Sequence, residues 1–228
     1  MKRIFLLLLM LGSAIAMHGQ GVSVARLLYQ GHGSIRLVTA NGLVIYIDPY
    51  AGKGYDLPAD YVFITHEHPD HNVVSLVPQK PGCRVFHAKN FFSGGRYGTA
   101  VLNGVRIQAV PAYNKNHKQT ECVGYVFTLE NGIKVYCAGD TSYTNYMEAN
   151  LSKMHIDYAL LPCDGVYNMD AKEAAHCADL IGAHYSIPIH TNPGALFDSS
   201  VAERFAPLYS LRLILKPSQE IFLEKLQP

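Results

Sequence analysis

A short apolar run leads directly into four side chains of the kinds that bind metal ions, and this segment constrains the fold more than any other. The apolar run is Tyr61 to Thr65, and residues 66–71 after it read HEHPDH. The ligand-type side chains are His66, His68, Asp70 and His71. In an extended chain alternate side chains share one side, and Pro69 then turns the chain towards a neighbouring position. Imidazole and carboxylate are ligands that Zn²⁺, Mn²⁺ and Fe²⁺ favour, so the segment predicts a metal site at a strand end, with a solvated polar loop as the alternative.

The surrounding sequence predicts one layered α/β domain without internal repeats or linkers. The turns Asn41-Gly42 and Asn131-Gly132, each between apolar runs, indicate two β-hairpins. Strands are expected over residues 25–30, 35–39, 43–47, 61–65, 84–87, 105–110, 123–129, 133–137, 158–161, 186–189 and 211–215. Helices are expected over 145–154, 170–183 and 199–209, and Asp170 and Glu173 are spaced as a capping box. This pattern places most of the polar residues of interest at strand ends.

The N-terminus has the features of a secretory signal peptide. Lys2 and Arg3 precede an apolar run over 4–11, and Ala14-Ile15-Ala16 offers the small residues that a signal peptidase needs. The run is shorter than the roughly 20 residues that span a bilayer. We therefore expect residues 1–19 to be a leader, cleaved after Ala16 or a few residues later, and residues 20–228 to be a single exported domain with no stable membrane insertion.

Charge and cysteine content narrow the partners. The formal net charge is +1, with no long run of Lys or Arg, which gives no support to a nucleic-acid partner. The five cysteines include no C-x-x-C pair, and their odd number leaves at least one unpaired within a monomer. We expect a small-molecule substrate as the partner.

The segment over 66–71 matches the His-x-His-x-Asp-His motif of the metallo-β-lactamase superfamily, and the chain resembles this family over nearly its whole mature length. More narrowly, it resembles the branch of ascorbate-6-phosphate lactonase-like proteins and other metal-dependent hydrolases. The stretches that carry this narrower likeness are Gly31-His32-Gly33-Ser34, Ile47-Asp48-Pro49, Val110-Pro111-Ala112-Tyr113-Asn114 and Leu160-Leu161-Pro162. The resemblance implies an α/β fold, a four-layer αββα sandwich of two mixed β-sheets flanked by helices.

The resemblance also implies two divalent metal ions, with Zn²⁺ preferred and Mn²⁺ or Fe²⁺ as alternatives. The ligands of the first would be His66, His68 and His117. The ligands of the second would be Asp70, His71 and His190, with Asp140 bridging the two ions. His117 lies in a stretch rich in Lys and Asn, so an exposed loop histidine is its alternative interpretation.

A mechanism follows from this ligand set. Two divalent ions would lower the pKa of a water molecule that attacks the substrate, and Asp70 would orient it and carry a proton to the leaving group. Asn114 and Tyr113 are candidates to stabilise the oxyanion, and a turn asparagine and a packed tyrosine are the alternatives. His32 is a candidate for the pocket rim or for a structural hydrogen bond. Asp48 is expected to support the metal loop from outside the ligand set.

The function most consistent with these residues is hydrolysis of a small substrate: a lactone, another ester or amide, or a phosphodiester. A β-lactamase and a metal-binding protein without hydrolytic activity are the alternatives. Asp70 opposes the second, because a purely structural site needs no further carboxylate beside an open coordination position. His68 opposes the flavin-linked di-iron reductases of the same fold, which have a carboxylate there. The leader and the low net charge oppose a tRNA-processing nuclease.

Overall fold

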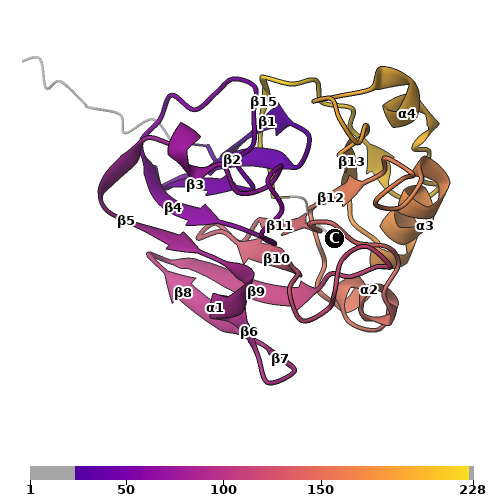
Figure 1. The fold of residues 1–228 in the computed structure, drawn as a ribbon, viewed down its shortest axis with the longest axis horizontal. Coiled ribbons are helices and arrows are strands. Elements are labelled where there is room, and N and C mark those ends of the chain that lie inside the picture. The colour runs from indigo at the N-terminus through magenta and orange to yellow at the C-terminus, as the bar shows by residue number, and fades with distance from the viewer. Residues whose placement is uncertain (1–23, 226–228) are drawn as a thin grey trace, which may run out of the picture.

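The computed structural model describes residues 24–225, which form two β-sheets packed face to face (Figure 1). The predicted leader lies outside these residues. Among the residues described, no helix is both long and apolar enough to cross a membrane. All five cysteines lie within this part of the chain, and none of them forms a disulfide.

The first sheet is mixed and has the strand order β15-β1-β2-β3-β4-β5. Its strands are β1 (Arg26–Gly31), β2 (Ser34–Val38), β3 (Val44–Ile47), β4 (Ala59–Phe63), β5 (Gln79–Phe86) and β15 (Gln219–Phe222). Neighbours from β15 to β3 are antiparallel, and β3, β4 and β5 run parallel. The carboxyl ends of β3 and β4 therefore share one edge, where the histidine-rich segment begins.

The second sheet is also mixed and has the order β14-β13-β12-β11-β10-β9-β8. Its strands are β8 (Thr99–Leu102), β9 (Val105–Pro111), β10 (Val123–Thr128), β11 (Lys134–Cys137), β12 (Tyr158–Pro162), β13 (Tyr185–Ile189) and β14 (Leu211–Arg212). Each neighbouring pair from β8 to β11 is antiparallel, and β11 to β14 run parallel. A separate two-stranded hairpin joins β6 (Phe92–Ser93) to β7 (Arg96–Tyr97).

The main core lies between the two sheets because alternate residues of each strand point inward. Phe63 of β4 is fully buried and meets Tyr125 and Phe127 of β10 edge to face, with ring centroids 5.3 and 5.2 Å apart. Leu27, Tyr29 and Ile107 belong to the same cluster. These contacts hold the loops at the ends of β4 and β10 in register.

Helices cover the outer face of the second sheet. They are α2 (Asn145–Ala149), α3 (Ala171–Ile181) and α4 (Ser199–Arg204), with the 3-10 turn η2 (Leu151–Lys153). Helix α3 begins at Asp170, whose side chain accepts from the backbone N–H of Lys172 and Glu173, so the predicted N-cap is present. Helix α4 ends at Arg204, short of the predicted 209, because Pro207 disfavours helical backbone at the residue before it.

The outer face of the first sheet is covered differently from the expected helical layer. Tyr46, Val62 and Ile64 pack there beneath loop residues Tyr55 and Leu57 and the 3-10 turn η1 (Val74–Leu76). The covering loop contains Gly52 and Gly54 at φ values of +89° and +94°, which a helix does not allow. The α/β class and the two mixed sheets are as predicted, and α1 (Ala88–Phe91) is a single turn after β5.

Candidate metal centre

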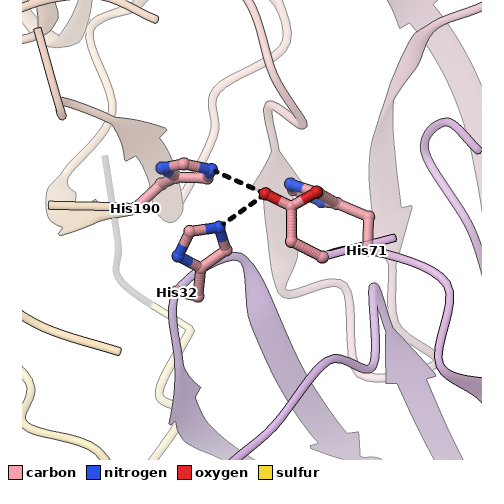
Figure 2. Close-up of side chains that lie close together, drawn as sticks. His32, His71 and His190 are labelled. Carbon is pink, nitrogen blue, oxygen red and sulfur yellow. Dashed lines mark hydrogen bonds and ion pairs between the residues drawn. The ribbon is translucent and has the colours of Figure 1, made fainter. Parts of the chain in front are cut away.

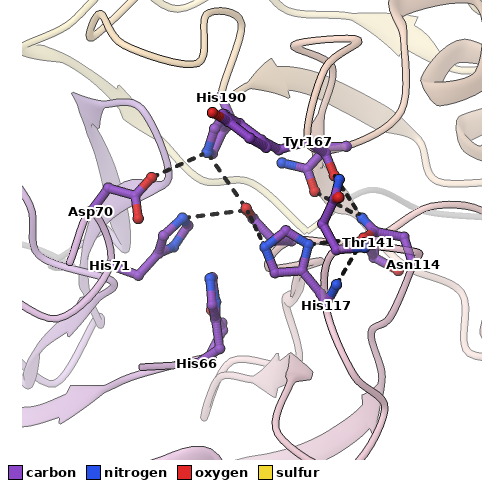
Figure 3. Close-up of polar contacts among 12 residues, drawn as sticks. His66, Asp70, His71, Asn114, His117, Thr141, Tyr167 and His190 are labelled. Carbon is purple, nitrogen blue, oxygen red and sulfur yellow. Dashed lines mark hydrogen bonds and ion pairs between the residues drawn. The ribbon is translucent and has the colours of Figure 1, made fainter. Parts of the chain in front are cut away.

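The predicted ligands come from four strand ends that meet at one end of the two sheets (Figure 3). The segment over 66–71 follows β4, His117 follows β9, Asp140 follows β11 and His190 follows β13. Strands β9, β11 and β13 all run in the same direction, so their carboxyl ends open towards the same space. The chain therefore brings together residues separated by more than a hundred positions.

The first group of ligands is His66, His68 and His117. One ring nitrogen from each lies within 4.8 Å of the others. The ring of His68 is 4.5 Å from that of His66 and 5.0 Å from that of His117, centroid to centroid. His117 is only 3% exposed, so it is not the exposed loop histidine of the alternative interpretation. His68 is the exposed member of this group.

The second group contains Asp70, His71 and His190, with ligand atoms within 4.8 Å of one another, and it also includes His32. Asp140 lies between the two groups. Its Oδ1 is 3.3 Å from His71 Nε2, and its Oδ2 is 3.3 Å from His117 Nε2 and 3.6 Å from His190 Nε2. One carboxylate therefore faces ligands of both groups, which is the arrangement expected of a bridging aspartate.

The buried histidines carry ring nitrogens that fit a metal ion. The Nε2 atoms of His66, His71 and His190 are buried and have no hydrogen-bond partner in the protein. A buried polar atom without a partner costs free energy, and a divalent cation would remove that cost. Burial and the nearby His71 hold the pKa of His66 well below its ordinary value, so its imidazole is neutral and free to bind a metal.

Asp140 and His71 are the charged pair at the centre. Burial would lower the pKa of His71, but Asp140 and Asp48 raise it to about 9. Burial would raise the pKa of Asp140, but His71 and His190 hold it below its usual range. Each of the two groups therefore favours the charged form of the other.

Each buried ligand histidine is oriented by a contact to its second ring nitrogen. The four contacts to Nδ1 are Thr65 Oγ1 with His66 at 3.0 Å, Asp48 Oδ2 with His71 at 2.9 Å, Asn114 Oδ1 with His117 at 2.9 Å, and Asp164 Oδ2 with His190 at 3.1 Å. Such contacts fix the ring so that Nε2 points at the metal. Of the four partners, the sequence indicated only Asp48 in this role.

Asp48 forms hydrogen bonds at both ends of the segment over 66–71, to Thr65 directly before it and to His71 at its end. It is 2% exposed, accepts from Thr65 N at 2.7 Å and Thr65 Oγ1 at 2.6 Å, and also binds His71. Its φ is +47°, and those of His32 and His190 are +55° and +46°. Non-glycine residues adopt this left-handed backbone at a cost, and such positions cluster at functional sites. His32 lies in the turn after β1, Asp48 directly follows β3 and His190 directly follows β13. All three residues therefore lie at strand ends around the candidate metal centre.

Thr65 and Asp164 were missed from the sequence. Thr65 directly precedes His66, and Asp164 follows the apolar run that ends at Pro162, so both occupy strand-end positions. The backbone N–H groups of Val166 and Tyr167 donate to Asp164 Oδ1. Burial would raise the pKa of Asp164, but His190 and the N–H of Tyr167 lower it to about 2, so it stays ionised beside the ligand.

For Asn114, the structure favours the turn asparagine over a residue that stabilises the oxyanion. Its Oδ1 accepts from the backbone and ring of His117, and its Nδ2 donates to Tyr167 O at 2.9 Å. The amide is fully used within the protein, so it supports a ligand and is not free to bind an oxyanion. Tyr113 is partly exposed and lines a hollow of about 340 Å³ with Tyr143 and Tyr167 beside the site.

For His32, the structure favours a structural hydrogen bond over a position on the pocket rim. Its side chain is 1% exposed, and its Nε2 lies 3.1 Å from Asp70 Oδ2. Asp70 itself is partly open, with 31% of its side chain exposed. Burial would raise the pKa of Asp70, but the hydrogen bond from His32 and the nearby His71 hold it below its usual range. Asp70 is therefore an ionised carboxylate at the opening of the site.

A family model for the beta-lactamase superfamily domain matches residues 26–190, which include every predicted metal ligand. The chain belongs to the metallo-β-lactamase superfamily. A UPF0173 metal-dependent hydrolase of Rubrobacter xylanophilus is 30% identical over 231 residues, covering 86% of this chain and 96% of that protein. A second UPF0173 metal-dependent hydrolase, of Thermococcus onnurineus, is 29% identical over 219 residues, covering 84% and 96%. The superfamily and the enzyme class expected from the sequence are confirmed.

Solved structures of this superfamily share the fold. A metallo hydrolase of Ignicoccus hospitalis superimposes with a TM-score of 0.70 at 23% identity, over 89% of this chain and 99% of that chain. A metallo-β-lactamase fold protein of Bacillus subtilis gives a TM-score of 0.65 at 14% identity, over 87% and 99%. At these identities the likeness shows the fold alone, and it confirms the predicted metallo-β-lactamase fold with its two mixed sheets.

Proposed function

We propose that this protein is an exported hydrolase with two divalent metal ions, which cleaves an ester, lactone, amide or phosphodiester bond in a small substrate. The observation that carries this proposal is the position of Asp140, whose two oxygens face the ligand histidines of two adjacent groups at 3.3 to 3.6 Å. A single structural metal site would need only one of these groups. Zn²⁺ suits the histidine-rich set best, with Mn²⁺ and Fe²⁺ as alternatives.

The proposed ligand residues form two groups, one for each metal ion. His66, His68 and His117 would hold one ion, and the ligands of the other would be Asp70, His71 and His190, with Asp140 shared. Bound there, the ions supply an acidified water and polarise the substrate oxygen under attack. Metal binding requires His71 to give up the proton that Asp48 and Asp140 stabilise.

Asp70 is the residue placed to handle the proton of the reaction. It is ionised, and it is the member of the second group whose side chain is open to the outside of the site. One oxygen is held by His32, which leaves the other to accept a proton from the attacking water and to return it to the leaving group. The neighbouring histidines are buried and oriented by the protein, so they are suited to ligation.

Tyr113 lines a hollow beside Asn114, the residue that contacts the His117 ring, and is our candidate for a substrate contact. The hollow that it lines also contains Lys115, Tyr143 and Tyr167. The backbone N–H of Tyr113 donates to Thr141 Oγ1 at 3.1 Å, one residue beyond Asp140. The hollow has a volume suited to a small organic group, and the tyrosines offer flat apolar contact surfaces with polar edges. This supports a small-molecule substrate.

The test combines metal content with hydrolysis. Protein purified with metals present is measured by elemental analysis and assayed on lactone, β-lactam and phosphodiester substrates. We expect two metal equivalents, turnover of one substrate class, loss of activity with a chelator and its recovery with Zn²⁺. Asp70→Asn should lower kcat by at least about 100-fold, and His176→Ala, at an exposed position of α3, should change nothing.

Three results would count against the proposal. Binding of no more than one equivalent of metal would remove the two-metal site. Two equivalents with no turnover of any substrate class would favour a metal-binding protein without hydrolytic activity. Turnover of β-lactams alone would favour the β-lactamase alternative.

Export is proposed from the leader sequence alone. The expected outcome is a mature protein found outside the cytoplasm, with a mass that corresponds to cleavage after Ala16 or shortly beyond it. Mass spectrometry of the protein from the periplasm or medium checks this. An uncleaved chain retained in the cell would contradict it.

A further inference from the structure

His32 occupies a tight turn between β1 and β2 that is bound to the metal centre on several sides. Its backbone N–H donates to Leu196 O at 2.7 Å, and its carbonyl accepts from His190 N at 2.9 Å. The next residue, Gly33, lies so close to His71 that an added Cβ would be 2.8 Å from its Cε1 atom. The turn thus has fixed contacts with two ligands of the second group.

The His32 side chain reaches the other members of this group. His32 and His190 lie side by side (Figure 2), and their ring centroids are 3.6 Å apart. Both rings approach Asp70 Oδ2, His32 Nε2 at 3.1 Å and His190 Nε2 at 3.9 Å. An ionised carboxylate only accepts hydrogen bonds, so the proton in the contact at 3.1 Å belongs to His32.

The distance between the rings of His32 and His190 shows whether His32 can bind the same metal ion as His190 or instead orients the ligands. Two imidazoles bound to one ion through Nε2, at about 2.1 Å and at right angles or wider, have ring centroids about 4.5 Å or more apart. The rings of His66 and His68 meet this condition at 4.5 Å. Those of His32 and His190, at 3.6 Å, do not. His32 is therefore too close to His190 for both rings to be ligands of the same ion.

We propose that His32 is a positioning residue of the second metal site, which donates from Nε2 to Asp70 and stacks on His190, and so sets the geometry of two ligands from one buried ring. This inference rests on the proposed two-metal site. It also explains why a histidine lies in a left-handed turn where glycine is the usual residue: the side chain is needed at that point.

The experiment measures the affinity of each metal equivalent by titrating the metal-free full-length protein with Zn²⁺ against a competing chelator dye. Two variants separate the contributions. His32→Asn suits the left-handed backbone but its short side chain cannot reach Asp70, whereas His32→Gln places an amide N–H close to the position of the histidine Nε2–H. His176→Ala is the control, at an exposed histidine of α3.

We expect His32→Asn to weaken one Zn²⁺ equivalent about 10- to 100-fold, to leave the other unchanged, and still to bind two equivalents at saturation. His32→Gln should recover part of the loss, because it restores the donor to Asp70. Titration with Co²⁺ should show an altered visible spectrum for the weakened equivalent only. His176→Ala should match the wild type.

Three outcomes would overturn the inference. Unchanged affinities in both variants would make the contact incidental. Equal losses in both variants would show that the hydrogen bond is not responsible. Loss of one equivalent even at saturating Zn²⁺ would make His32 a ligand. A wild-type chain that binds a single equivalent would overturn the two-metal site and this inference together, which distinguishes the two failures.

Discussion

Asp48→Asn is the sharpest test of a residue that orients the proposed metal ligands without being a ligand itself. Asparagine has the same shape and tolerates the left-handed backbone that Asp48 adopts at φ +47°. The amide oxygen can still accept from Thr65 N. The new NH₂ group, however, faces the hydroxyl of Thr65 and Nδ1 of His71, both of which donate to the carboxylate at 2.6 and 2.9 Å.

The magnitude follows from burial and charge. Both partners are buried, Asp48 at 2% and His71 at 1% exposure, and His71 carries a proton at neutral pH in the metal-free protein because its pKa is about 9. Removing one member of a buried ion pair costs about 3–5 kcal/mol. Since His71 would also lose its orientation, we expect the second metal equivalent to bind about 10- to 100-fold more weakly.

Denaturant unfolding of the metal-free protein gives the first quantity, and competition titration with Zn²⁺ gives the second. Asp56→Asn is the matched control, because Asp56 is an exposed carboxylate paired with Arg36 and its loss should cost less than about 1 kcal/mol. A loss of stability in Asp48→Asn below about 1 kcal/mol, together with an unchanged Zn²⁺ affinity, would refute the idea that Asp48 organises this side of the site.

Three further predictions test other contacts of the site. Asn114→Ala removes the acceptor for the His117 ring, so the first metal equivalent should weaken about 10- to 100-fold in Zn²⁺ titration, and an unchanged value would contradict this. Gly33→Ala should destabilise the protein by about 1–3 kcal/mol in denaturant unfolding, because the added Cβ would overlap His71. The control Gly194→Ala, at a position surrounded by open space, should leave the stability unchanged. Equal effects of the two substitutions would refute the steric argument. Because His71 with a pKa of about 9 must lose its proton to bind a metal, Zn²⁺ affinity should rise steadily from pH 6 towards pH 9 with release of a proton to a weak buffer, and a flat profile would contradict it.

The spatial clustering of the proposed ligand residues could be predicted from the sequence because they lie in one motif or follow recognisable strands. The segment over 66–71 follows a run of apolar residues, and Asp140 and His190 stand at the ends of two others. Strand direction then brings these ends together. The polar surroundings of His117 in the sequence left an exposed loop histidine open as the alternative, and its burial at 3% exposure favours the ligand interpretation.

The residues around the ligands could not be predicted in the same way. Thr65 and Asn114 each contact a histidine ring through a hydrogen bond, and Asp164 contacts one as an ion pair. Such contacts depend on side-chain direction after the chain has folded. Asn114 and His117 are three residues apart in a turn, a spacing that suits a local hydrogen bond as well as a substrate contact. The sequence does not distinguish these roles.

In the fold, too, some elements could be predicted from sequence patterns, whereas others depend on how the chain packs. Hairpin turns and apolar runs predicted most strands, whereas β15, β8 and the β6–β7 hairpin were missed because they are short edge or surface strands with weak apolar alternation. The helical layer expected over the first sheet is replaced by a loop and η1. Glycines at positive φ within that loop were visible in the sequence, but their effect depends on where the loop packs.

Anomalous diffraction from crystals of the Zn²⁺-loaded protein tests the central claim most directly. We expect two zinc peaks, one among His66, His68 and His117 and one among Asp70, His71 and His190, with Asp140 in contact with both. A single peak, or a second zinc ion away from Asp140, would contradict it.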